Sequence, residues 1–190
     1  YVSQFNLNTS FDGSDLLYTR IKAGNGNNTP WEDTALGTHL SASHDQDNLE
    51  IDKIWYEFPV GANFRAWVGP KIENYYMLAS APSIYKPVMK QFANGGNGAA
   101  YGSSTDGGFG LAWTQPTNDP SEGRFEVSTN YVSKGAGFAQ THTGGGIFGD
   151  NQAKWLTKVG YGATRWQVSV GIAQHMCEDH TDGSENGTGY

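Results

Sequence analysis

Hydrophobic and polar residues alternate one by one along most of this chain. The clearest case is 124–132, RFEVSTNYV, where Phe125, Val127, Thr129 and Tyr131 suit an apolar surface and the residues between them suit water. Strict alternation is typical of a β-strand whose two faces meet different surroundings. The pattern recurs in further segments, so we expect about eight strands in all, the others being 2–11, 15–24, 49–58, 64–71, 108–115, 153–161 and 165–173.

The connections between these segments differ in length in a regular order. Short connections at 11–14, 59–63, 116–123 and 162–164 alternate with long ones at 25–48, 72–107 and 133–152. Tight turns at one end and long loops at the other are typical of an outer-membrane β-barrel. A soluble β-sandwich also has alternating strands, but its connections need not sort by length, and it is the alternative.

Composition agrees with an all-β protein. The 190 residues suffice for one domain with a sizeable core, and they include 37% hydrophobic residues, 13% aromatic residues and 26 glycines. No run of about 18 apolar residues is present, so we expect no transmembrane helix. The formal charge of −7 argues against a nucleic-acid partner. No signal peptide is visible, and both ends suggest a processed or partial chain.

Basic residues gather on the polar side of the predicted strands. Of the 12 Lys and Arg residues, nine lie there: Arg20, Lys22, Lys53, Arg65, Lys71, Arg124, Lys154, Lys158 and Arg165. Glu57 and Glu126 share polar strand positions, while Lys86 and Lys90 lie in the longest loop. A water-filled lumen can carry such a biased wall, so we expect these residues to line a pore and to favour anions. The alternative is that they solvate the outer face of a soluble sheet.

The expected pairing of strands keeps charges off the apolar side. Mirroring the chain about its short connections sets Glu57 opposite Arg65, and Asn6 opposite Arg20. Opposite charges across a strand pair contribute a few tenths to about 1 kcal/mol. An interfacial belt of aromatic residues would fit the apolar positions near strand ends, namely Phe58, Phe64, Tyr131, Trp155 and Trp166.

The longest connection, 72–107, is too apolar for a loop that is exposed to water along its whole length. Pro87 could begin a short helix that carries Lys90. We expect this loop to fold back into a barrel and to narrow its lumen. The alternatives are a lid over a soluble core and a contact with a neighbouring subunit. An eight-stranded barrel has room only for side chains, so a fold-in loop predicts a larger barrel.

Three stretches of the chain are similar to a known family: FNLNTSFDGSDLLYTRIKAGN, IDKIWYEFPVGANFRAWVGPKIENYYMLASAPSIYKPVMKQFANGGNGAAYGSS and GGFGLAWTQ. In these stretches the chain resembles the cyanobacterial Som-type outer-membrane porins, which are often labelled iron-uptake porins and are related to the carbohydrate-selective porins. The resemblance is dense over 1–24 and 49–115. It implies that 1–190 is a partial porin domain, an antiparallel transmembrane β-barrel with a constriction loop at about 72–107.

The same resemblance implies a function and a location. Porins of this type let small hydrophilic solutes and inorganic ions diffuse passively across the outer membrane, commonly as homotrimers surrounded by outer-membrane lipid. Family members grip peptidoglycan through a surface-layer-homology domain that this sequence does not contain. The family labels "iron" and "carbohydrate" do not choose a solute for this chain.

We expect no enzyme, cofactor or metal site. The segment HMCEDH, 175–180, gathers metal-ligand residue types, but its spacing matches no established site. No Ser or Cys has a base placed to activate it. The functional alternative is a soluble carbohydrate-binding β-sandwich module that would use Trp31, Tyr75 and Tyr76.

Overall fold

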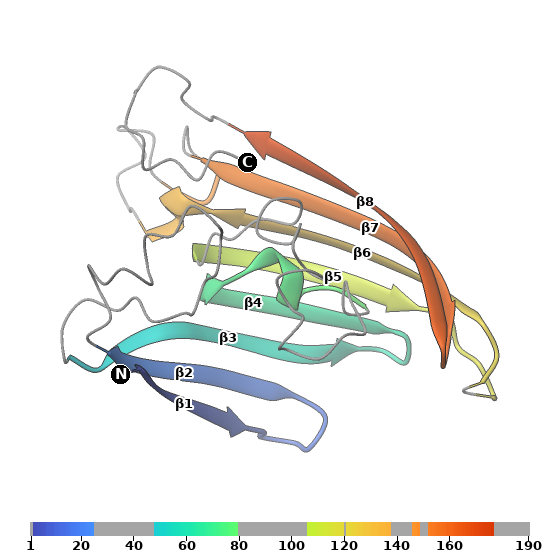
Figure 1. Cartoon of the computed structure of the whole chain (residues 1–190), viewed down its shortest axis with the longest axis horizontal. Coiled ribbons are helices and arrows are strands. Elements are labelled where there is room, and N and C mark those ends of the chain that lie inside the picture. Colours follow the sequence, from blue (N-terminus) through green and yellow to red (C-terminus); the bar gives the residue numbers. More distant parts are fainter. Residues whose placement is uncertain are drawn as a thin grey trace.

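Eight β-strands form one antiparallel sheet, in which each strand pairs with its neighbours in chain order (Figure 1). The computed structural model describes residues 2–24, 48–79, 106–119, 121–137, 146–148 and 152–176. The strands are β1 (Val2–Thr9), β2 (Leu16–Gly24), β3 (Glu50–Val60), β4 (Phe64–Ile72), β5 (Asp106–Thr114), β6 (Arg124–Ser133), β7 (Ala153–Ala163) and β8 (Trp166–Met176). Two 3-10 helices are described, η1 (Asn74–Tyr76) and η4 (Lys134–Gly137). The all-β prediction is confirmed.

The four short connections lie at one end of the sheet because every strand runs antiparallel to the next (Figure 1). The register of β1 and β2 agrees with the prediction, with Asn6 opposite Arg20. The predicted register of β3 and β4 is wrong, since Glu57 lies opposite Trp67 and Arg65 lies opposite Pro59. The turn is centred one residue later than expected, and Gly61 begins it with a positive φ of 67° that glycine adopts without strain.

A β-bulge in β4 reverses the direction of one predicted wall residue. Val68 pairs with Tyr56, and Lys71 pairs with Ile54, so between these two pairings β4 advances by three residues and β3 by two. Pro70 lies in this bulge, a position that tolerates its missing N–H. The bulge places the exposed side chain of Lys71 on the side of Ile54, and its ammonium donates to the carbonyl of Ile51 at 2.9 Å. The prediction that Lys71 lies on the polar face is therefore wrong.

The two faces of the sheet differ in burial: one exposes large hydrophobic side chains, and the other buries charged and amide side chains together with a hydrophobic cluster around Trp55, Trp67 and Val132. We call the side that carries Phe5, Val127 and Val170 the apolar face, and the opposite side the polar face. Large hydrophobic side chains on the apolar face are exposed, among them Phe5, Leu7, Val68, Leu111, Phe125, Val127, Val159, Val168, Val170 and Ile172. On the polar face the buried side chains include Lys53, Trp55, Trp67, Glu126, Ser128, Asn130 and Lys158.

Residues 73–79, which follow β4 and which we call the covering segment, lie over part of the polar face. From Ile72 the chain passes β5 and reaches β6 and β7, where Asn74 donates from its amide to Asn130 Oδ1 at 2.8 Å. Asn130 in turn donates to the carbonyl oxygen of Met77 at 3.2 Å, so the two asparagines clasp the segment. Met77 is fully buried, and a Cβ added to Gly110 beneath it would lie 2.8 Å from Met77 Cβ. A glycine on β5 thus lets the segment pack directly on the sheet.

Within the described ranges, no helix is long and apolar enough to cross a membrane.

Candidate functional site

Most of the predicted wall residues lie together on the polar face. The strand pairings place nine of them there: Arg20, Lys22, Lys53, Glu57, Arg65, Arg124, Glu126, Lys154 and Lys158. Lys71 lies on the apolar face, as described above. Arg165 lies in the turn between β7 and β8 and not on a strand, so its predicted strand position is wrong. Lys86 and Lys90 lie outside the described residues.

Carboxylates neutralise two basic side chains near the long-loop end of β2 and β3. Arg20 forms an ion pair with Asp52. The register between β2 and β3 shifts at this point and leaves Asp52 as the additional residue, which brings its carboxylate to Arg20. Lys53, almost fully buried, forms an ion pair with Glu73, the residue that directly precedes η1. The second ion pair therefore ties the covering segment to β3.

A third ion pair is buried on β6 and β7. The ammonium of Lys158 has no solvent exposure and donates to Glu126 Oε1 at 3.0 Å, while Gln167 donates to the same oxygen at 2.6 Å. Gly160, beside Lys158 on the same face, makes room for this carboxylate, because an added Cβ would lie 2.6 Å from Glu126 Oε1. A buried charge pair with these extra hydrogen bonds is rigid, and removing one partner is costly.

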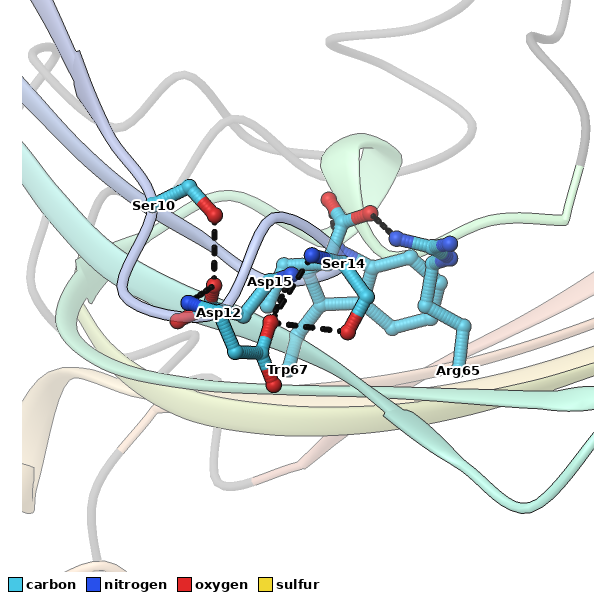
Figure 2. A network of polar contacts seen from close by, with 7 residues as sticks. Ser10, Asp12, Ser14, Asp15, Arg65 and Trp67 are labelled. Carbon is cyan, nitrogen blue, oxygen red and sulfur yellow. Dashed lines mark hydrogen bonds and ion pairs between the residues drawn. The ribbon is translucent and has the colours of Figure 1, made fainter.

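The fourth ion pair lies at the short-connection end of β3 and β4. Arg65 Nη1 lies 2.5 Å from Glu57 Oε1, and the indole N–H of Trp67 donates to Glu57 Oε2 at 2.9 Å (Figure 2). Both carboxylate oxygens are thus engaged. The pair is diagonal and not directly opposite, but Glu57 offsets Arg65 as the sequence predicted.

Aromatic rings pack between these ion pairs. Tyr18 and Trp55 stack with centroids 5.0 Å apart, and Tyr76 lies 5.8 Å from Trp55. Tyr75 and Tyr76 stack at 4.5 Å, and the ammonium of Lys53 lies 5.4 Å from the centre of the Tyr76 ring. Burial raises the pKa of Tyr75 well above its usual range, so this hydroxyl stays neutral. The rings fix η1 against β2 and β3 by mutual contact.

A cavity of about 620 Å³ opens on the polar face at the short-connection end. The β3–β4 turn, the connection between β5 and β6, and residues of the covering segment from Tyr76 to Ala79 surround it. Among the described residues, its charged side chains are Glu57, Arg65 and Arg124. The cavity is therefore polar, and arginine supplies its positive charge.

The β1–β2 turn is held by a hydrogen-bonded carboxylate. Asp15 Oδ1 accepts from the Ser10 hydroxyl at 2.6 Å and from the backbone N–H of Asp12 (Figure 2). The same oxygen accepts from the backbone N–H of Phe11, and Oδ2 accepts from the Tyr56 hydroxyl at 2.7 Å. These donors, the Ser10 hydroxyl foremost, hold the pKa of Asp15 well below its usual range. Both carboxylate oxygens of Asp15 are thus engaged in holding the turn and in joining it to β3.

Aromatic residues on the apolar face gather at both of its ends. At the short-connection end, the ring centroid of Tyr161 lies 4.6 Å from that of Phe125 and 5.6 Å from that of Trp166. At the other end, Tyr131 lies 5.8 Å from Trp155. These contacts include Tyr131, Trp155 and Trp166 of the predicted belt.

The sequence analysis did not predict four residues that organise the polar face. Asp52 and Glu73 supply carboxylates to basic side chains, and Asn74 and Asn130 hold the covering segment. Alternation along a strand predicts on which face a residue lies, but it gives no signal for a bulge or for contacts between residues 56 positions apart.

In the described ranges, no three His, Cys, Asp or Glu side chains are grouped as a metal site would require. His175 is described, whereas Cys177 to His180 are not.

No protein family model matches the sequence. No solved structure matches the chain either. The chain is similar to a protein of Nostoc sp. (strain PCC 7120) that is described as "Uncharacterized protein alr4550". The two are 30% identical over 129 residues, which cover 58% of this chain and 21% of that protein. The chain thus spans about one fifth of the length of this relative. The similarity is to a cyanobacterial protein without a described function, and the porin family stays a prediction.

Proposed function

We propose that this chain is part of an outer-membrane porin, a passive diffusion channel for small hydrophilic solutes and inorganic ions. The observation that carries the proposal is the unequal burial of the two faces. One face exposes a row of Val, Ile, Leu and Phe side chains, which suits lipid, while the other buries charged and amide side chains beside the hydrophobic cluster around Trp55, Trp67 and Val132. In water, such an extended apolar surface would promote association.

Strand length and connections support the same proposal. Strands of 8–11 residues match the length that crosses a bilayer at a tilt. Short connections at one end and long ones at the other are typical of outer-membrane barrels. Aromatic side chains at both ends of the apolar face suit the two membrane interfaces. The Nostoc relative supports a cyanobacterial source, and we propose the outer membrane as the location.

In this proposal the segment 73–79 belongs to a loop that narrows the lumen. An eight-stranded barrel has space for side chains alone, yet here the polar face carries both a chain segment and a cavity of about 620 Å³. The chain would therefore be part of a larger barrel, with β1 and β8 pairing to further strands, and the homotrimer is part of the proposal. No catalytic residue, cofactor or metal has a role in it.

The wall of the proposed pore is mixed in charge. Four of its basic side chains, Arg20, Lys53, Arg65 and Lys158, have carboxylate partners. Selectivity for anions would therefore be weaker than the number of basic residues suggests, and it would depend on residues such as Arg124. The carbohydrate-binding alternative gains no support from Tyr75 and Tyr76, because these rings stack on each other.

The experiment is single-channel recording of the protein at its full natural length in a planar lipid bilayer. The proposal predicts discrete conductance steps with a modest preference for anions. Protein that is folded and inserted, yet gives no steps, would contradict the channel and favour the binding module. Glu57→Gln removes one wall carboxylate, so it should shift the reversal potential toward anions, while the exposed Ser169→Asn on β8 serves as a neutral control.

A further inference from the structure

We propose that the cavity at the short-connection end binds a small oxyanion, with Arg65 and Arg124 as the recognising groups. The inference rests on the proposed channel in one respect, since it places the cavity on the path of a diffusing solute. The cavity itself is defined by the described residues and has a volume of about 620 Å³. This volume admits a phosphate or carboxylate group together with water.

The charges around the cavity favour an anion. Arg65 is held by Glu57, whose two oxygens accept from Arg65 and from the indole of Trp67. The side chain of Arg65 is still 46% exposed and lines the cavity, while the Glu57 carboxylate fixes its orientation. Among the described residues, no carboxylate forms an ion pair with Arg124, which is exposed and lines the same cavity. One positive charge therefore remains uncompensated.

The geometry of the donors favours an oxyanion. A guanidinium presents a planar fork of N–H groups that matches the paired oxygens of a carboxylate or phosphate. Gln115 adds a neutral donor to the lining, because its Oε1 accepts from the backbone N–H of Phe125 at 3.0 Å and its amide NH2 group remains for a ligand. Two arginines on different strands, β4 and β6, would thus hold the anion from two sides.

Three aromatic residues line the cavity, and Phe64 is placed on the apolar face by its pairing with Trp113. The other two do not offer the flat platform on which a sugar ring would stack. Trp67 is only 4% exposed, and its N–H is committed to Glu57. Tyr76 is covered by Tyr75 and packs near Trp55. Besides the Glu57 carboxylate, which Arg65 and Trp67 engage, the polar groups of the described lining are guanidinium, amide and hydroxyl groups, and these recognise charge and oxygen atoms.

The test is calorimetric titration of the full-length protein in detergent with inorganic phosphate and, separately, with acetate. We expect saturable binding of phosphate, of acetate or of both, and the anion that binds more tightly identifies the oxyanion group that the cavity prefers. Arg124→Gln should weaken this binding by about tenfold or more, as loss of a charge-assisted, bidentate contact does. Arg124→Lys, which keeps the charge and loses the fork, should lie between Arg124→Gln and the wild type.

Arg165→Gln is the matched control, because it removes the same charge from the exposed β7–β8 turn, outside the cavity lining. Equal weakening by Arg165→Gln and Arg124→Gln would overturn the proposal, as would a wild type that binds neither anion saturably. Circular dichroism establishes that each variant is folded. Bilayer recordings on the same preparations separate the two proposals: conductance steps without anion binding reject the subsite alone, and anion binding without steps rejects the channel alone.

Discussion

A charge placed at the middle of the apolar face distinguishes lipid from water as its surroundings. Val170 lies near the centre of β8, pairs with Val159 and is 66% exposed. If this position meets the middle of a bilayer, Val170→Arg should reduce the free energy of unfolding by about 2–4 kcal/mol. If the position meets water, the same change should stay within about 0.5 kcal/mol, as exposed substitutions do.

The neighbouring residue supplies the control. Ser169 is also exposed, and it lies on the polar face opposite Gly160. Ser169→Arg makes the same charge change one residue away on the other face. Urea unfolding of the full-length protein in lipid vesicles measures both variants. A loss of about 2–4 kcal/mol corresponds to roughly 30- to 1,000-fold in the unfolding equilibrium. Equal, small effects of the two arginines would show that the apolar face does not meet the middle of a bilayer.

Three further predictions concern the polar face and its turn. Asn130→Ala removes the clasp on the covering segment, so we expect a larger single-channel conductance and a loss of about 1–3 kcal/mol in stability; unchanged conductance would show that the segment does not narrow the path. Glu126→Gln removes the carboxylate that faces the buried ammonium of Lys158, and it should reduce the free energy of unfolding by about 3–5 kcal/mol. Lys158→Met in the same chain should recover most of this loss. If stability does not recover, the loss is not an effect of charge. The hydrogen bond from the Ser10 hydroxyl, and then the other hydrogen bonds to Asp15, lower the pKa of this carboxyl from its ordinary 3.8. The contribution of Asp15 to stability is therefore complete above pH 3.8, and it is lost as the pH falls through the lower pKa of the folded state. Urea unfolding between pH 7 and pH 2 should therefore show less acid sensitivity in Asp15→Asn, and equal pH profiles would contradict this.

Strand positions were predictable because alternation and turn residues are local signals. The segment 124–132 was predicted as a strand, and β6 spans Arg124–Ser133. The same alternation separated the two faces correctly for Arg20, Glu57 and Lys158, since each strand keeps its parity as long as no residue is inserted.

The remaining features depend on contacts that have no local pattern. The bulge at Pro70 moved Lys71 to the apolar face, because one inserted residue reverses the side on which every later residue lies. The carboxylates of Asp52 and Glu73 reach their partners through a register shift and through the covering segment, so the balance of charge could not be counted from strand positions alone. The clasp between Asn74 and Asn130 joins residues that only the folded sheet brings together.

Cysteine labelling along β8 in proteoliposomes tests most directly whether the apolar face meets lipid. Single cysteines replace residues 168 to 172 one at a time in full-length protein from which Cys177 and any further cysteine have been removed, and a membrane-impermeant thiol reagent is added. All five native residues are exposed in the structure, so a β8 surrounded by water on both sides would label at every position. If the apolar face meets lipid, positions 169 and 171 are labelled, whereas positions 168, 170 and 172 are protected. Uniform labelling of both faces would contradict this prediction.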